Sequence, residues 1–172
     1  FCLSRGLGDV YKRQVEGEIT AQGGLVETSG KTIHVEGPDS LVSVGHGGTW
    51  LLNAENVSVG LSLADLAEAE LLAGASVILQ AKDNVNFQAG ITVAATGNLK
   101  IAVDSDGDGA GSILMNGHQV NFTGGTGNVD FYYNPTSYAD SSGDFVGAVT
   151  VGTGTFIPWM WVHDLADLQA IN

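Results

Sequence analysis

The sequence predicts an all-β protein, a right-handed parallel β-helix (solenoid) with one short helix inserted and a short C-terminal helix. The chain is 44% hydrophobic and has 25 glycines but only three prolines. It is therefore too apolar for a disordered tail and too glycine-rich for a helical bundle. Short β-rich runs follow one another between Gly, Asn, Asp and Ser, and Asn116-Gly117 is the one candidate for a tight hairpin turn. Such strands must find partners far along the chain.

The spacing of these runs indicates how they pair. Grouped in threes, they form the three sides of successive coils. The sides begin at Val77, Val85 and Ile91, then at Leu99, Ile113 and Val120, and then at Val129. First sides are thus 22 and 30 residues apart, a period typical of solenoids. We expect Val77, Leu99 and Val129 to stack above one another, with alternate apolar side chains pointing inward.

One segment breaks the β pattern. SLADLAEAELLAG predicts a helix at about residues 62–73, with Ser62 as its N-cap and Gly74 at its end. We expect this helix to cover an edge or one end of the solenoid. A second short helix is expected near the C-terminus, at Asp164 to Ile171.

The first 14 residues differ in character from the rest. SRGLGDVYKRQ, residues 4–14, contains three of the six basic side chains, and its eleven residues resemble the translation of a transposase-end sequencing adapter. We interpret residues 1–14 as a non-native, adapter-derived arm and expect the remaining chain to be a fragment. That remainder has three basic and 18 acidic residues, which excludes nucleic acid and anionic membranes as partners.

The arm also contains the only cysteine, Cys2, so the rest of the chain offers neither a disulfide nor a cysteine-based zinc site. No apolar run approaches the roughly 20 residues that span a bilayer, so we expect no membrane insertion.

The strongest chemical candidate is the acidic insertion DSDGDG. Its alternating carboxylates, Asp104, Asp106 and Asp108, match the first half of a calcium-binding EF-hand loop. The twelfth position is Met115 instead of the bidentate Glu that such a loop requires. We therefore expect no metal or other cofactor, with Ca²⁺ binding by these three carboxylates as the alternative. The four scattered histidines are predicted to be turn or surface residues: His34, His46, His118 and His163.

No catalytic constellation is evident in the sequence, so we expect a non-enzymatic protein. The acids fall in turns and inserts with no two at an evident shared coil position, and only Lys82 and Lys100 could align on adjacent coils. The alternatives are a carbohydrate-active β-helix enzyme, which would need converging carboxylates, and a passive spacer. The aromatic residues near the C-terminus are predicted to seal an open solenoid end rather than to stack on sugars: Phe131, Tyr132, Tyr133, Tyr138, Phe156, Trp159 and Trp161.

Two motifs carry a family resemblance. GGLVETSGK at residues 23–31 and GTWLLN at residues 48–53 resemble the passenger region of filamentous-haemagglutinin-like adhesins of the two-partner secretion type. Asn53-Ala54 stands where that family often has Asp-Pro. We expect Glu27, Thr28 and Ser29 before Gly30 to form a corner that holds backbone N–H groups. Trp50, Leu51 and Leu52 are expected to form a bulky rung that fills the interior.

The resemblance extends to the end of the chain. YYNP at residues 132–135 and HDLADLQAIN at residues 163–172 are similar to the linker that leads into a further repeat module. We therefore expect a β-helix segment at 15–133 and a linker at 134–172. The family implies export through an outer-membrane transporter partner and a secreted or cell-surface location. It also implies attachment to a host-cell or bacterial surface receptor or glycan.

Overall fold

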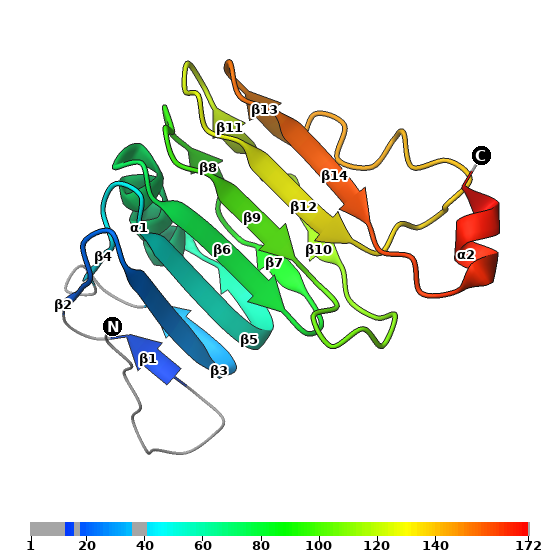
Figure 1. Ribbon diagram of the computed structural model, residues 1–172, viewed down its shortest axis with the longest axis horizontal. Helices are drawn as coiled ribbons and strands as arrows, with labels where there is room; N and C mark the ends of the chain where they lie inside the picture. Colours follow the sequence, from blue (N-terminus) through cyan, green and yellow to red (C-terminus); the bar gives the residue numbers. More distant parts are fainter. Residues whose placement is uncertain (1–12, 16–17, 36–40, 172) are drawn as a thin grey trace.

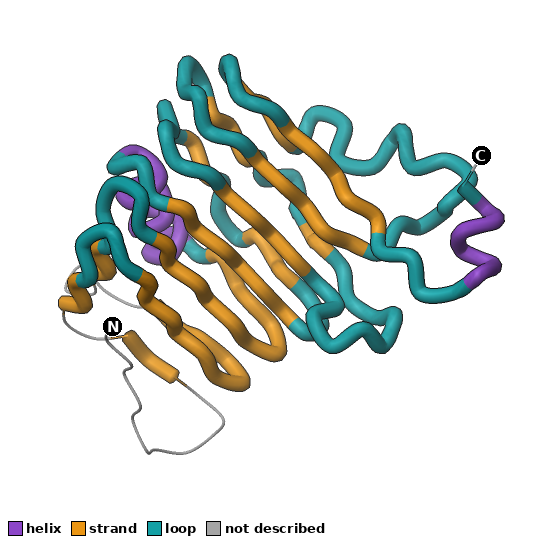
Figure 2. Tube along the Cα trace, in the orientation of Figure 1, coloured by secondary structure: helices purple, strands orange, loops and turns teal. Residues whose placement is uncertain are grey.

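The computed structural model describes residues 13–15, 18–35 and 41–171. Within them the chain winds into a β-solenoid of about five turns built from parallel sheets, with only two short helices (Figures 1 and 2). The predicted fold class is confirmed. The interpretation of residues 1–14 as a non-native arm falls mostly outside the described residues.

Three walls enclose the interior. The main sheet contains β3 (Leu25–Val35), β5 (Thr49–Val59), β6 (Ser76–Ala81), β9 (Leu99–Ala102), β12 (Val129–Tyr133) and β14 (Phe156–Met160). The second wall continues from the end of β5 through β7 (Val85–Phe87) and β10 (Ile113–Leu114). The third wall contains β8 (Ile91–Thr92), β11 (Val120–Phe122) and β13 (Val149–Val151). In the first coils, β1 (Arg13–Val15) pairs with the end of β3, and β2 (Glu18–Thr20) pairs with β4 (Leu41–Ser43).

The predicted coil register is confirmed. Val77 pairs with Leu99, and Leu99 pairs with Val129. On the other two walls, Val85 pairs with Ile113 and Ile91 with Val120. The inward-facing residues in these rows are fully buried except Ile113, which is 9% exposed, because each coil covers the apolar surface of the coil before it.

The corner that leads into the main sheet is built from glycine and asparagine. A Cβ on Gly97 would lie 1.8 Å from Ala75 O, and a Cβ on Gly127 would lie 2.0 Å from Gly97 O, so only glycine fits this stack. The next position forms a hydrogen-bonded ladder, in which Asn98 Oδ1 accepts from the backbone N–H of Asn128 at 3.0 Å. Asn128 Oδ1 in turn accepts from the N–H of Thr155 at 2.9 Å. These side chains satisfy the backbone where the chain leaves one wall for the next.

The inserted helix occupies a different position from the one predicted. Helix α1 (Leu61–Leu72) contacts β4 of the preceding coils and β8 of the following one, so it replaces a strand within the third wall (Figure 1). It does not cover an edge or an end. Its N-cap is Gly60, without a side-chain cap, instead of Ser62. Side chains of α1 accept hydrogen bonds from the backbone of the coils on both sides. Glu70 Oε2 accepts from Val44 N at 2.9 Å and from Gly45 N at 3.1 Å. Glu68 Oε1 accepts from Thr92 N at 2.6 Å on the other side.

The solenoid extends farther than the sequence predicted. Strand β13 pairs with β11, and β14 pairs with β12, so the expected boundary between a β-helix at 15–133 and a linker at 134–172 is wrong. The parallel pairing continues to Met160. Beyond it, helix α2 (Leu165–Ala170) confirms the expected short C-terminal helix, and Asp164 accepts from the N–H of Asp167 as its N-cap.

The two family-like motifs adopt only part of their expected structure. Glu27, Thr28, Ser29 and Gly30 lie within β3 and form no corner, because the register with β5 continues through them. Trp50 and Leu52 are fully buried, as predicted. Leu51 instead points outward and is half-buried, because successive residues of a strand face opposite sides.

Candidate functional site

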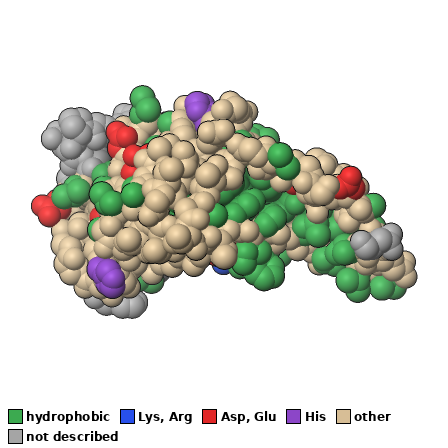
Figure 3. Space-filling model, turned by 90° about the horizontal axis from the view of Figure 1, so that it is seen from above, with side chains coloured by type: hydrophobic (Ala, Val, Ile, Leu, Met, Phe, Trp, Pro, Cys, Tyr) green, Lys and Arg blue, Asp and Glu red, His purple; other side chains and the backbone are tan. Residues whose placement is uncertain are grey.

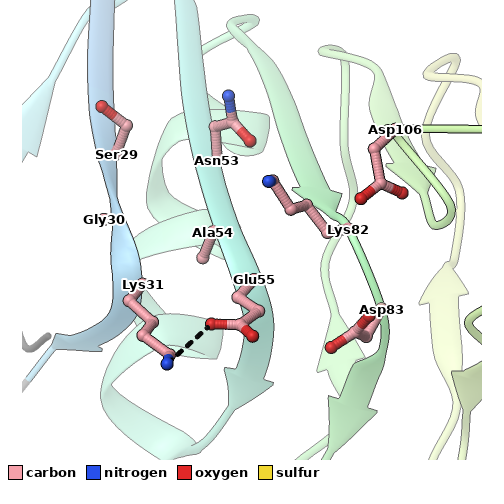
Figure 4. Close-up of a pocket in the computed structure, with 9 residues that line it drawn as sticks. All are labelled: Ser29, Gly30, Lys31, Asn53, Ala54, Glu55, Lys82, Asp83 and Asp106. Atoms are coloured by element: carbon pink, nitrogen blue, oxygen red, sulfur yellow. Dashed lines mark ion pairs between the residues drawn. The ribbon is translucent and has the colours of Figure 1, made fainter.

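The outward side chains of the main sheet form a surface that we call the outer face. At one end of it lies an open hollow of about 520 Å³, lined by Ser29, Gly30, Lys31, Asn53, Ala54, Glu55, Lys82, Asp83 and Asp106 (Figure 4). Strand β3 supplies the first three of these residues and β5 the next three. The remaining residues follow the end of β6 or belong to the acidic insertion.

Charged groups of both signs surround the hollow. Lys31 Nζ lies 3.5 Å from Glu55 Oε2, with both side chains nearly half exposed, so this ion pair stabilises the fold only weakly. Lys82 extends from the end of β6 toward Asn53 (Figure 4). Asp83 Oδ2 accepts from Asn56 Nδ2 at 3.2 Å. The hollow thus presents ammonium, carboxylate, amide and hydroxyl groups to solvent, a set that suits a polar, hydrogen-bonding ligand.

The sequence did not predict this convergence. Asp83 and Asp106 were expected in unrelated turns, yet they reach the same hollow as Glu55. The suggested alignment of Lys82 with Lys100 is wrong, because Lys100 pairs with Ile78. Lys82 follows Ala81, whose register partner is Ala54, and so lies beside Glu55. The coil register contained the information needed to predict this arrangement, because aligning β5 with β6 places Lys82 beside Glu55.

The acidic insertion brings its three carboxylates together. Ligand oxygens of Asp104, Asp106 and Asp108 lie within 4.8 Å of one another. Asp104 is buried, and both of its carboxylate oxygens already have partners in the protein. Oδ1 accepts from Gly109 N at 3.1 Å, while Oδ2 lies 3.3 Å from Asn134 Nδ2 and 3.0 Å from His163 Nε2. The loop is therefore held by protein donors, and Asp106 and Asp108 are exposed.

We expect Ca²⁺ to raise the melting temperature of the protein no more than Mg²⁺ does at the same concentration, because Asp104 is already engaged by His163 and Asn134 and Glu is missing at the twelfth position. Differential scanning fluorimetry measures these melting temperatures on protein that has first been treated with EDTA to remove bound metal. A rise specific to Ca²⁺ that Asp106→Asn abolishes would contradict the expectation.

The described histidine side chains do not gather at one place. His46 is exposed in a turn before β5, and His118 is half-buried in the turn before β11. The side chain of His34 lies outside the described part of the structure. His163 has a role that the sequence did not predict: its Nε2 lies 2.8 Å from Asn134 Oδ1 and 3.0 Å from Asp104 Oδ2. It thereby fastens the C-terminal segment to the acidic insertion.

The C-terminal aromatic residues divide into two sets. Phe131, Tyr133, Phe145 and Phe156 pack edge-to-face at the last coils, with ring centroids 4.8 to 6.4 Å apart. Tyr132 and Trp159 instead stack on the outer face with centroids 6.0 Å apart, and Lys100 Nζ lies 4.3 Å from the Tyr132 centroid. Lys100 on β9 and Trp159 on β14, the two strands that flank β12, thus both contact the Tyr132 ring, so this ring is already engaged by protein groups.

The last coil is not completely covered. Its inward residues, Val149, Val151, Phe156 and Met160, are only partly buried, whereas their row partners Val120, Phe122 and Val129 are fully buried. Hydrophobic side chains gather in a hollow on the upper surface (Figure 3). The interior aromatic set therefore fills this end without sealing it.

Tyr133 has an unusual titration. Burial, together with the hydrogen bond that its hydroxyl donates to Asp144 Oδ2 at 2.9 Å, raises the pKa of Tyr133 from 10.0 to about 12. Because the folded state holds this proton more tightly than the unfolded chain, the stabilisation is complete below pH 10 and is lost as the pH rises to about 12.

We expect Tyr133→Phe to remove a late step from the tyrosinate absorbance titration, and Asp144→Asn to move that step to lower pH. Tyr132→Phe serves as the control that leaves it in place. An Asp144→Asn titration that coincides with the wild-type curve would show that this hydrogen bond does not hold the proton.

No family model, curated protein or solved structure matches this chain. Among the described residues, no helix combines the length and apolar character that crossing a bilayer demands.

Proposed function

We propose that this chain is a segment of a large secreted, cell-surface adhesin of the filamentous-haemagglutinin type, in which a β-solenoid stalk mediates attachment without catalysis. The observation that carries the proposal is the coil-on-coil register, in which Val77, Leu99 and Val129 stack in one row. Strand pairing joins each coil only to the coils beside it, so added coils lengthen the rod by about 4.8 Å each. The resemblance of VETSGK and GTWLL to that family supports the adhesive role.

Export is part of the proposal. A transporter partner in the outer membrane would pass the chain unfolded, and folding would then proceed coil by coil outside the cell. The lack of cysteine after Cys2 favours this route, because no disulfide can form before transport. Fusing a secretion domain of this family to the chain and co-expressing its transporter tests the route. Appearance of the chain in the medium supports it, and retention in the periplasm argues against it.

Attachment itself can be measured with coated beads. Fluorescent beads that carry the full chain should bind epithelial or bacterial cells more strongly than albumin-coated beads, and excess soluble chain should compete. Glu55→Ala and Lys82→Ala beads then test whether the charged hollow takes part. Binding no stronger than that of albumin across such cells would overturn the adhesive role and favour the passive spacer.

A carbohydrate-active enzyme is the second candidate, because three carboxylates and two lysines line one hollow on a sheet surface. Acid–base cleavage of a glycan needs such converging groups. A screen of neutral and acidic polysaccharides for newly formed reducing ends tests this reading. Activity that Glu55→Gln and Asp106→Asn abolish, while Asp65→Asn on the exposed side of α1 retains it, would replace the non-enzymatic proposal.

A further inference from the structure

The outer face differs in charge from the rest of the molecule. Every lysine or arginine after residue 13 lies on it, namely Lys31, Lys82 and Lys100. Five acids share the face or line its hollow, namely Glu27, Glu55, Asp83, Asp106 and Asp130, so the net charge of the face is −2. The chain as a whole has a net charge of −13, so most of its excess negative charge lies away from this face. Two copies of this protein therefore repel each other least where their outer faces meet.

The coil register arranges the outward side chains in straight rows across the strands. One row contains Glu27, Leu51, Ile78 and Lys100, on β3, β5, β6 and β9 in that order. A second row contains Ser29, Asn53, Gln80 and Ala102 on the same strands. Glu55 and Lys82 are adjacent in a third row, one residue past Ala54 and Ala81.

We propose that the outer face binds a second copy of this chain, about a twofold axis parallel to the strands that passes between β5 and β6. This axis places β3 opposite β9 of the second copy, and β5 opposite β6. Glu27 then meets Lys100 of the second copy, and Glu55 meets Lys82. Between these charge pairs, Leu51 meets Ile78 and Asn53 meets Gln80. The face is therefore self-complementary: acidic side chains meet lysines, apolar side chains meet apolar side chains, and amides meet amides.

The size of the contact sets its strength. Four strands about 4.8 Å apart and about seven residues long, at about 3.3 Å per residue, give roughly 440 Å² per copy. The total of about 900 Å² falls below the size of stable interfaces. The dimer is consequently weak, depends on protein concentration and dissociates as salt screens the four charge pairs.

Sedimentation velocity of the full chain over a concentration series, at low and high salt, tests the proposal. A concentration-dependent dimer is expected at low salt. Glu27→Lys and Lys100→Glu each create two like-charge contacts and should each raise the dimer Kd at least about tenfold. The double variant Glu27→Lys/Lys100→Glu restores both pairs and should return the Kd to near the wild-type value. These two residues are three strands apart within one copy, so the rescue reports a contact between copies.

Asp65→Lys on the exposed side of α1 is the matched control, because it changes the net charge as Glu27→Lys does but lies away from the outer face. It should leave dimerisation intact. Circular dichroism verifies that each variant is folded. The proposal is overturned by a chain that stays monomeric at low salt, by single variants that dimerise as the wild type does, or by a double variant without rescue. Association through the open C-terminal end would survive all of these substitutions and would overturn it equally.

Discussion

Replacing Leu52 by alanine is expected to lower the free energy of unfolding by about 2–5 kcal/mol, whereas the same replacement at Leu51 should cost under about 1 kcal/mol. Leu52 is fully buried, in a row with Thr28 and Leu79. Removing its side chain leaves a cavity that the coils above and below cannot fill without moving. Leu51 points outward and is only half-buried, so its loss exposes little new apolar surface.

Urea denaturation followed by circular dichroism measures both variants, and the pair supplies its own control because the two residues are chemically identical neighbours. Equal losses at Leu51 and Leu52 would mean that β5 does not alternate as the solenoid requires. A larger loss at Leu51 would reverse the register of the main sheet and with it the composition of the outer face.

The coil register could be predicted from the sequence because it depends on alternation and spacing alone. Apolar residues at every second position need a covered side, and strands without tight turns between them must pair with the next coil. These two conditions placed Val77, Leu99 and Val129 in one row, as the structure has them. Neither condition depends on a particular side-chain contact.

The last coil was missed because the linker was expected from YYNP at residues 132–135 and HDLADLQAIN at residues 163–172, and that expectation was extended over the residues between them. A recurring corner would have revealed the coil: Thr-Gly-Asn precedes Leu99 and Val129, and Thr-Gly-Thr precedes Phe156. Pro158 is tolerated in β14 because its backbone nitrogen faces away from β12, toward the edge at which no described strand pairs with β14. Val129 N donates to Thr155 O and Trp161 N donates to Tyr133 O, so odd-numbered residues face β12 and Pro158 faces the free edge.

The candidate site was harder to predict than the fold. Glu55, Asp83 and Asp106 belong to different coils, and their convergence depends on a one-residue offset between strand ends that composition does not reveal. The contact between His163 and Asp104 spans 59 positions of sequence and two turns of the solenoid. No local sequence pattern predicts such a pair, since the acidic motif around Asp104 does not include His163.

Replacing Glu70 by alanine is the other change with a large expected effect, because helix α1 takes the place of a strand in the third wall. A strand would accept hydrogen bonds from the preceding coil through its carbonyls, but the carbonyls of a helix are used within the helix. Glu70 is buried and its Oε2 accepts from both Val44 N and Gly45 N. Each buried N–H left without a partner costs about 1–3 kcal/mol, so we expect a loss of about 2–5 kcal/mol in unfolding free energy.

Asp65→Ala, on the exposed side of the same helix, should change stability by less than about 0.5 kcal/mol and controls for the loss of a carboxylate from α1. Glu70→Gln keeps one acceptor oxygen, so its loss of unfolding free energy should fall between those of Glu70→Ala and Asp65→Ala. Hydrogen exchange at Val44 and Gly45 supplies the specific readout, because these amides lose protection only if Glu70 is their acceptor. If Glu70→Ala matches Asp65→Ala in stability and both amides stay protected, the helix must be joined to the wall by its apolar face alone.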